Sequence, residues 1–226
     1  VRNACRMRLR VNAPVPVGDY LADLPSAEPD PAEPLERGAL REWVWHAVSE
    51  LSPPLRLVVM LRYFTAVTAY QDIALACGIP VGTVRSRLSE ARGRLARGLL
   101  TSADAAYGGV SGVAEQRCRE AEALIGSFDH GRIADIAGQL WLPTVEFRWA
   151  SGKRTKGYDY PLRALDRDLS AGVRFRLLNV VGGSDAAIWE TALINPSDDP
   201  THCPPAALWV LQLSDGRAEH LRILHP

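Results

Sequence analysis

The chain has 226 residues, enough for two small domains that each bury a core, and its formal net charge at pH 7 is zero. The four cysteines are far apart and none forms a C-x-x-C pair, so their spacing indicates neither a zinc site nor a disulfide framework, and we expect no metal and no cofactor. The sequence has no apolar run of the roughly 20 residues that a membrane span needs, and we expect no signal segment. We therefore expect a protein of the reduced cytoplasm without membrane contact.

The zero net charge is a sum of unequal segments. Residues 1–12 carry four arginines and no acid, residues 13–35 carry five acids and no base, and residues 36–99 carry nine arginines and five acids. Positive charge is therefore concentrated in the N-terminal half of the chain. A polyanionic partner is expected to bind there.

The first 35 residues are predicted to hold a helix end and a linker. Residues 1–12, which include VRNACRMRLR, read as the end of an Arg-rich helix. Residues 13–35 hold six prolines among their acids. This composition disfavours both helix and sheet, and it predicts an extended linker.

Two helices are predicted between residues 36 and 64. In the first, apolar side chains recur every three or four residues and form one face. They are Leu40, Trp43, Val44, Ala47, Val48 and Leu51. Ser52 is predicted to cap the second helix, which Pro53 and Pro54 open. This helix is apolar on nearly all sides, so we expect it to be buried.

The next two helices form a recognisable pair. Thr68 and Gln71 fit the S/T-x-x-E/Q capping box ahead of a short helix, AYQDIALAC, which Gly78 is predicted to end. Pro80 lies in the first turn of the helix that follows, where a missing N–H costs nothing. A short helix, a tight turn with glycine and a longer helix are the layout of a helix-turn-helix motif.

The longer helix has a buried stripe and an Arg-rich exposed face. The stripe, spaced by three and four residues, consists of Val84, Leu88, Ala91 and Leu95. Guanidinium groups suit guanine edges and phosphates in a major groove, and small residues in the first turn allow a close approach of the backbone. The candidate DNA contacts are Pro80, Gly82, Thr83, Arg85, Ser86, Arg87, Ser89 and Arg92. A helix of this kind can also be a solvated surface helix, but the short helix and turn before it favour DNA binding.

The stretch LSPPLRLVVMLRYFTAVTAYQDIALACGIPVGTVRSRLSEARGRL resembles region 4 of sigma factors of the extracytoplasmic-function (ECF) type, in the sigma-70 family. The resemblance implies that the segment Pro80–Arg92 enters the major groove at the minus-35 promoter element. It also implies that an apolar face of the first two helices contacts the flap of the RNA polymerase β subunit. The residues of this face are Val48, Leu51, Leu55, Val58 and Val59.

The resemblance also divides the chain. Residues 1–12 resemble the last helix of sigma region 2, residues 13–35 then correspond to the linker between the two promoter-binding regions, and residues 36–99 are predicted to form region 4. The sequence departs from the family pattern at Asp72, at Cys77 and at Glu90, where an acid puts some of the phosphate affinity in doubt.

A second linker is predicted over residues 100–113, and an α+β domain over residues 114–226. We expect helices at about 114–128 and 132–141, the strand TVEFRWA, a helix near 160–169, and then strands. The strand-like runs are VRFRLLNVV, AAIWETALIN, ALWVLQL and RAEHLRIL. The pairs Gly182-Gly183 and Asp215-Gly216 fall at hairpin turns, so the sheet is predicted to be mostly antiparallel.

This order of elements resembles the SnoaL-like fold, the cone-shaped superfamily of nuclear transport factor 2 and ketosteroid isomerase. The resemblance lies in FDHGRIADIAGQLWLPTVEFRWASG and in the closing DGRAEHLRIL. A cone implies either an aromatic core or a pocket for a small-molecule ligand. The candidate pocket residues are Trp141, Trp149, Tyr158, Trp189, Trp209 and His220.

Catalysis is the less favoured interpretation of this domain, and we expect no enzyme. The residue types that transfer protons in this superfamily are present as His130, Tyr158, Asp159, Glu190 and His220. Several have an ordinary structural explanation, since His130 falls in a turn, Asp159 resembles a helix cap, and Glu190 and His220 could pair with arginines such as Arg176 or Arg222.

The favoured hypothesis is a sigma factor whose region 4 directs RNA polymerase to promoters and whose SnoaL-like domain regulates it. Two alternatives stay open. One is an enzyme of the polyketide cyclase or isomerase type with a DNA-binding appendage. The other is a ligand-responsive one-component regulator that binds DNA without polymerase.

Overall fold

The computed structural model describes residues 42–101 and 110–225. The described residues all belong to one compact unit of the chain, which begins at Gly38. The predictions of an Arg-rich helix end and of an acidic linker lie outside the described residues. Among the residues described, no helix is both long enough and apolar enough to cross a membrane.

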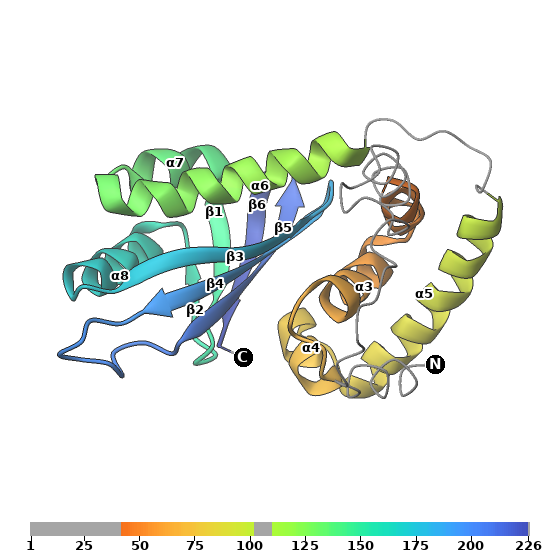
Figure 1. Cartoon of the computed structure of the whole chain (residues 1–226), viewed down its shortest axis with the longest axis horizontal. Helices are drawn as coiled ribbons and strands as arrows, with labels where there is room; N and C mark the ends of the chain where they lie inside the picture. The colour runs from red at the N-terminus through yellow and green to blue at the C-terminus, as the bar shows by residue number, and fades with distance from the viewer. Residues whose placement is uncertain (1–41, 102–109, 226) are drawn as a thin grey trace, which may run out of the picture. The chain divides into compact units, whose positions relative to one another are not determined.

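The described part opens with helices. Residues 42–49 are helical, and α3 (Pro53–Phe64), α4 (Tyr70–Cys77) and α5 (Val81–Thr101) follow (Figure 1). Proline is tolerated at the start of α3 because the first N–H groups of a helix have no partner within the helix. The buried residues of α3 are Leu55, Leu57, Val58, Val59, Met60 and Leu61. The prediction that this helix is buried is confirmed.

The turn between α4 and α5 is built on Gly78. Its φ of 67° lies in the left-handed region, which glycine adopts without the steric cost of a Cβ atom. Its N–H group points at the carbonyls of Ala74 and Leu75, which satisfies acceptors at the end of α4. A side chain here would also collide with the guanidinium group of Arg222. Gly78 therefore ends α4 as predicted.

The predicted capping box is wrong. Helix α4 begins at Tyr70 with Ala69 in the cap position, and no side chain caps its N-terminus. Thr68 lies one residue too early to cap, and its carbonyl instead accepts a hydrogen bond from Arg62 Nη1 at 2.7 Å. Ser52 does occupy the cap position of α3, but its side chain makes no capping hydrogen bond.

The second predicted linker is described only at its ends. Helix α5 continues to Thr101 and α6 (Val110–Ser127) begins at Val110. Within the predicted range 100–113, residues 102–109 lie outside the described residues. The division of the chain at this point stays a prediction.

The C-terminal part forms one six-stranded sheet in the order β2-β1-β6-β5-β4-β3. Its strands are β1 (Trp141–Arg148), β2 (Arg154–Lys156), β3 (Arg174–Gly182), β4 (Ala186–Ile194), β5 (Ala206–Ser214) and β6 (Arg217–Leu224). Strands β1 and β6 are parallel and the other neighbouring pairs are antiparallel, so the sheet is mostly antiparallel as predicted. Asp215 and Gly216, with φ values of 48° and 79°, make the predicted turn between β5 and β6.

Helices α6, α7 (Ile133–Leu140) and α8 (Asp159–Ser170) pack against one face of this sheet (Figure 1). The core between them and the sheet holds large aromatic side chains, among which Trp141, Phe147 and Trp189 are at most 2% exposed. The predicted α+β arrangement is confirmed: two helices, a strand, a helix, and then the remaining strands. The short strand β2 was missed, because three residues without a buried side chain carry no apolar alternation.

The opposite face of the sheet is also covered. Side chains of β3, β4 and β5 that point away from the aromatic core join the α3, α4 and α5 side chains in a second core. The strand residues of this core are Val181, Ala186, Ile188, Leu208 and Val210. Successive strand residues alternate between the two cores, as Ile188 and Trp189 do, so β4 and β5 are apolar on both faces.

Candidate nucleic-acid interface

The exposed face of α5 carries the predicted DNA contacts. Val84, Leu88 and Ala91 are at most 1% exposed and fix the orientation of the helix against α3 and α4. Exposed on the other side are Pro80, Gly82, Arg85, Ser86, Ser89 and Arg92. Thr83 and Arg87 are half-buried. The structure therefore brings the candidate contacts together along one helix that follows a tight turn.

One of these side chains is held in place by hydrogen bonds that it donates to neighbouring helices. Arg92 Nε donates to Tyr63 Oη at 3.0 Å, and Arg92 Nη2 donates to Tyr70 Oη at 3.5 Å. These bonds raise the pKa of Arg92, so its guanidinium group stays charged. Neither tyrosine was a predicted site residue. The sequence feature that could have indicated them is their position on the two helices that support α5.

The residues predicted to contact polymerase are buried. All five are at most 4% exposed and lie in the core that the helices share with β3, β4 and β5. They are Val48, Leu51, Leu55, Val58 and Val59. Their predicted role in binding the polymerase flap stays a prediction, and in this conformation none of them is open to a partner.

Arg56 links the helices to the turn between β3 and β4. Its Nη2 donates to the carbonyls of Ser49 at 2.6 Å and Leu51 at 2.7 Å, and its Nη1 forms an ion pair with Asp185. The Arg56 side chain is only 11% exposed. A guanidinium group suits this place because its fixed fork of donors can serve several acceptors at once.

Glu190 and Asn179 make a second polar link at the end of α3. The Ala66 N–H donates to Glu190 Oε1 at 2.8 Å, and Asn179 Nδ2 donates both to Glu190 Oε2 and to the Phe64 carbonyl, each at 2.8 Å. The sequence left open that Glu190 pairs with an arginine. It instead accepts hydrogen bonds from a backbone N–H group and an amide, because strand β4 points it at the helices.

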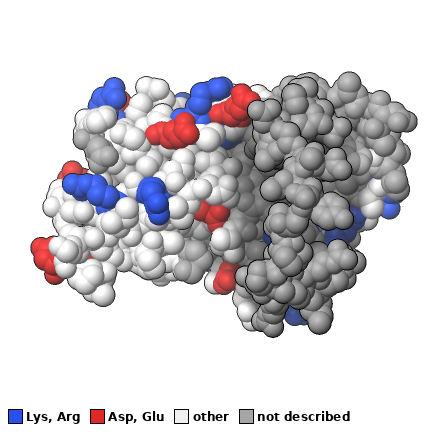
Figure 2. All heavy atoms as spheres, in the orientation of Figure 1, with Lys and Arg blue, Asp and Glu red and all other residues white. Residues whose placement is uncertain are grey.

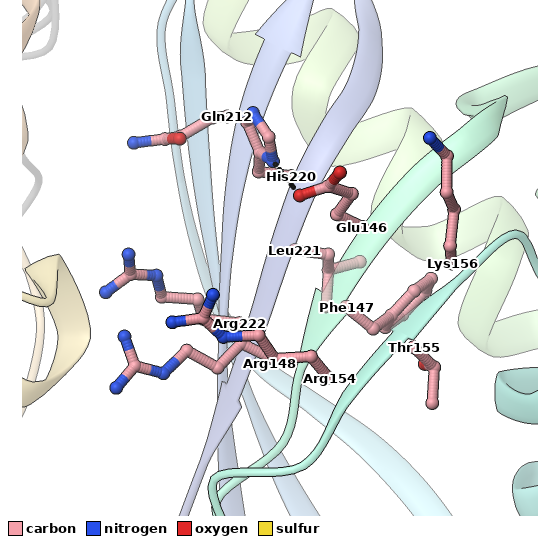
Figure 3. Close-up of a pocket in the computed structure, with 10 residues that line it drawn as sticks. All are labelled: Glu146, Phe147, Arg148, Arg154, Thr155, Lys156, Gln212, His220, Leu221 and Arg222. Carbon is pink, nitrogen blue, oxygen red and sulfur yellow. Dashed lines mark ion pairs between the residues drawn. The ribbon is translucent and has the colours of Figure 1, made fainter.

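Strands β2, β1 and β6 carry a row of arginines that the sequence did not reveal. Arg148 lies directly opposite Arg154 on β2 and opposite Arg222 on β6. The three side chains line a pocket of about 540 Å³ and their guanidinium groups gather at one end of it, as Figure 3 shows. Elsewhere, on the face seen in Figure 2, basic and acidic side chains are interspersed.

His220 was predicted to line the cone, and this prediction is wrong. Leu221 and Ile223 of β6 point into the aromatic core, so His220, which precedes Leu221, points to the other face. There it lies 3.6 Å from Glu146, at the opposite end of the arginine pocket from the guanidinium groups (Figure 3).

The cone itself is largely filled. A cavity of about 180 Å³ lies under α8, and its aromatic lining includes Phe147, Trp149, Tyr160, Phe175 and Trp209. Of the other predicted pocket residues, Trp141 and Trp189 are buried in the core and Tyr158 packs against it, without lining the cavity.

A cluster of metal-ligating residue types lies at the edge of this cavity. The ligand atoms of Asp168, His202 and Cys203 are all within 4.8 Å of one another. The cysteine spacing in the sequence did not indicate such a grouping, because the fold brings α8 next to the loop after β4. The Asp168 carboxylate already accepts two hydrogen bonds from Arg167 at 3.2 Å, so its charge has a partner without an ion.

Comparison with known proteins assigns the helical part. Residues 41–95 match a family model described as "Sigma-70, region 4". This segment is a sigma-70 region 4. A search of the curated proteins finds no match to the chain.

Solved structures similar to part of the chain share low identity with it. A proposed SnoaL-like polyketide cyclase from Jannaschia sp. CCS1 has 16% identity, with 50% of this chain and 86% of that chain covered and a TM-score of 0.40. A proposed SnoaL-like isomerase from Agrobacterium tumefaciens has 18% identity, coverage of 50% and 98%, and a TM-score of 0.41. A proposed polyketide cyclase from Streptomyces antibioticus has 13% identity, coverage of 48% and 91%, and a TM-score of 0.41.

The structure accommodates the unexpected acid on α5. Glu90 Oε1 accepts a hydrogen bond from Arg94 Nη2 at 2.8 Å, one helical turn further on. Both side chains are about half exposed, so the pair adds little to stability. Its effect is to compensate the negative charge of Glu90 on the exposed face of α5.

Proposed function

We propose that the chain acts as a sigma factor, in which α5 of region 4 reads the minus-35 promoter element for RNA polymerase in the cytoplasm. The observation that carries the proposal is the exposed row of Arg85, Ser86 and Ser89 on a helix fixed by its own buried stripe. Side chains near the start of such a helix reach base edges in a major groove, and later arginines contact phosphate.

We further propose that the C-terminal domain regulates polymerase binding by covering the flap-binding face. The apolar side chains predicted to meet the flap share a core with β3, β4 and β5. Polymerase would reach them after the helices part from the sheet. If polymerase binds only the state in which the helices have parted from the sheet, its binding shifts the equilibrium toward that state. Packing of the sheet on the helices then lowers the apparent affinity for polymerase.

Loosening the polar link at the end of α3 tests this proposal. The double variant Asn179→Ala, Glu190→Ala removes the hydrogen bonds from Asn179 to the Phe64 carbonyl and from the Ala66 N–H to Glu190, and it leaves the apolar core unchanged. We expect it to bind purified core RNA polymerase about 30-fold more tightly than the wild type, because the two bonds are worth about 1 kcal/mol each and every 1.4 kcal/mol is a factor of about ten. Co-purification and titration with core polymerase measure this.

The matched control is Arg176→Ala, an exposed residue on the same strand as Asn179. It should bind polymerase like the wild type. Equal polymerase binding by the double variant and the control would contradict regulation by the sheet. A wild-type chain and double variant that both fail to bind polymerase would favour the one-component regulator over the sigma factor.

We assign the cone a small apolar ligand at most, and no catalysis. None of the five candidate catalytic residues is among the described residues that line the cavity. Its volume of about 180 Å³ lies below the roughly 300–1,000 Å³ of typical ligand sites and near that of a cavity that takes up benzene.

Benzene is therefore a suitable probe of the cavity. We expect it to shift the tryptophan fluorescence of the wild type, because Trp149 and Trp209 line the cavity. The variant Ala164→Leu, which enlarges a side chain at the cavity wall, should lose the response, whereas Ala123→Leu on the exposed side of α6 should keep it. No shift in the wild type would mean that the cone is closed to ligands.

A further inference from the structure

The arginine row places three like charges on adjacent strands. Arg148 is the direct cross-strand neighbour of both Arg154 and Arg222. Directly opposite side chains of an antiparallel pair, such as Arg148 and Arg154, have Cβ atoms only about 4.5–5.5 Å apart, and like charges there are destabilising. Among the residues that the structure describes, no carboxylate forms an ion pair with any of the three. The fold therefore tolerates a repulsion that an anion would relieve.

The neighbouring row of the same strands is balanced. Glu146 lies opposite Lys156 on β2 and opposite His220 on β6, and its carboxylate is 3.6 Å from His220 Nδ1. Two residues further along β1, the corresponding position holds Arg148 and not an acid. In Figure 3 the three guanidinium groups extend together, away from Lys156 and from the Glu146–His220 pair. The positive charge is thus concentrated at one end of the pocket.

This end of the pocket adjoins the helix-turn-helix of region 4. Arg222 Nη1 donates to the Ala76 carbonyl at 3.3 Å and lies against Gly78, which forms the turn before α5. Burial raises the pKa of Cys77 to about 11, while Arg222 and Arg87 act in the opposite direction because both lie near its thiol. Arg87 belongs to α5, so the arginine row is close to the DNA-reading helix.

We propose that Arg148, Arg154 and Arg222 bind phosphate groups of the DNA backbone beside the bases that α5 reads. The proposal rests on the proposed function of α5. Several guanidinium forks around one pocket match the oxygens of phosphate, which accept paired hydrogen bonds. While the helices are packed on the sheet, the C-terminal domain thereby extends the DNA-binding surface of region 4. A free phosphate compound has the same chemistry, and the experiment separates the two sources.

The test compares the variant Arg148→Ala, Arg154→Ala with the wild type and leaves Arg222, which contacts Ala76, in place. Each phosphate contact contributes about 0.9 to the slope of log affinity against log salt concentration, so the slope should fall by about 1–2. We expect a similar loss of affinity, about 10-fold in dilute salt, for duplexes of any sequence. Because the variant removes like-charge repulsion, its thermal midpoint should equal or exceed that of the wild type.

The charge-matched control is Arg163→Ala, Arg176→Ala, two exposed arginines on α8 and β3. It should keep the wild-type salt slope. An unchanged salt slope in the Arg148→Ala, Arg154→Ala variant would overturn the proposal. This holds even if the Arg85→Ala, Arg87→Ala variant loses its sequence preference, a result that supports only the proposed function of α5. A lower thermal midpoint in the first variant would also overturn it, in favour of a structural role for the arginines.

The second part of the experiment uses inorganic phosphate and tripolyphosphate as ligands in place of DNA. If the wild type binds no DNA, the proposed function and this inference both fail, and each phosphate is then tested for a rise in thermal midpoint. A rise that the Arg148→Ala, Arg154→Ala variant loses would assign the arginine row to a free phosphate compound and overturn its assignment to DNA.

Discussion

The double variant Arg85→Ala, Arg87→Ala should lose at least about 10-fold in affinity for the duplex that the wild-type chain prefers, and much less for a shuffled duplex. Each arginine that contacts a guanine edge contributes about 1–3 kcal/mol of discrimination. Arg85 is exposed near the start of α5, and Arg87 is half-buried beside it. Fluorescence anisotropy on both duplexes measures the two losses.

The matched control lies on the same helix. Arg94 and Arg97 follow Arg87 by roughly two and three helical turns, and their double replacement by alanine removes the same charge. Later arginines of a recognition helix contact phosphate, so this control should weaken binding to both duplexes by a similar factor. An Arg85→Ala, Arg87→Ala variant that behaves like the control would contradict base reading by α5.

Replacing Ile188 by alanine should lower the free energy of unfolding by about 2–5 kcal/mol, the range for emptying a packed aliphatic site. Ile188 is 0% exposed and lies in the core that β4 shares with the helices of region 4. Because this core belongs to both parts, the helices and the sheet should unfold in one transition. Urea titrations followed by circular dichroism and by tryptophan fluorescence measure both.

Ile194 on the same strand provides the control. It is 51% exposed, so Ile194→Ala should change the free energy of unfolding by less than about 0.5 kcal/mol. If Ile188→Ala costs no more than Ile194→Ala, the two parts do not share a core. Separate transitions for the helical signal and the tryptophan signal would likewise mean that the helices and the sheet unfold independently.

The sequence was most informative where structure is local. Helices α3, α4 and α5 depend on Gly78, on Pro53 and on apolar residues three and four positions apart, and all of these act within a few residues of the chain. The candidate DNA contacts on α5 could be predicted for the same reason. The capping box failed by one residue, since the sequence does not show which of Thr68 and Ala69 takes the non-helical cap conformation.

The arginine row could not be predicted, because it depends on strand register. No sequence motif marks these arginines. Arg222 is far from Arg148 and Arg154 in the sequence, and the three side chains meet only through the pairing of β2, β1 and β6. His220 was misplaced for a related reason: a one-residue change of register moves a side chain to the other face of a sheet.

The shared core did leave a signal in the sequence. Helix α3 is apolar on nearly all sides, and β4 and β5 hold the continuous apolar runs AAIW and ALWVL. A strand that is apolar at successive positions is buried on both faces. The two features together indicate that the helices and the sheet bury apolar side chains against each other. No single motif indicates this.

Selection from a pool of random duplexes by the purified chain tests base reading by α5, the central claim, most directly. In dilute salt the wild type should enrich one short motif, and Arg85→Ala, Arg87→Ala should enrich none or a different one. Enrichment of no motif by the wild type, or of the same motif by the variant, would contradict the claim.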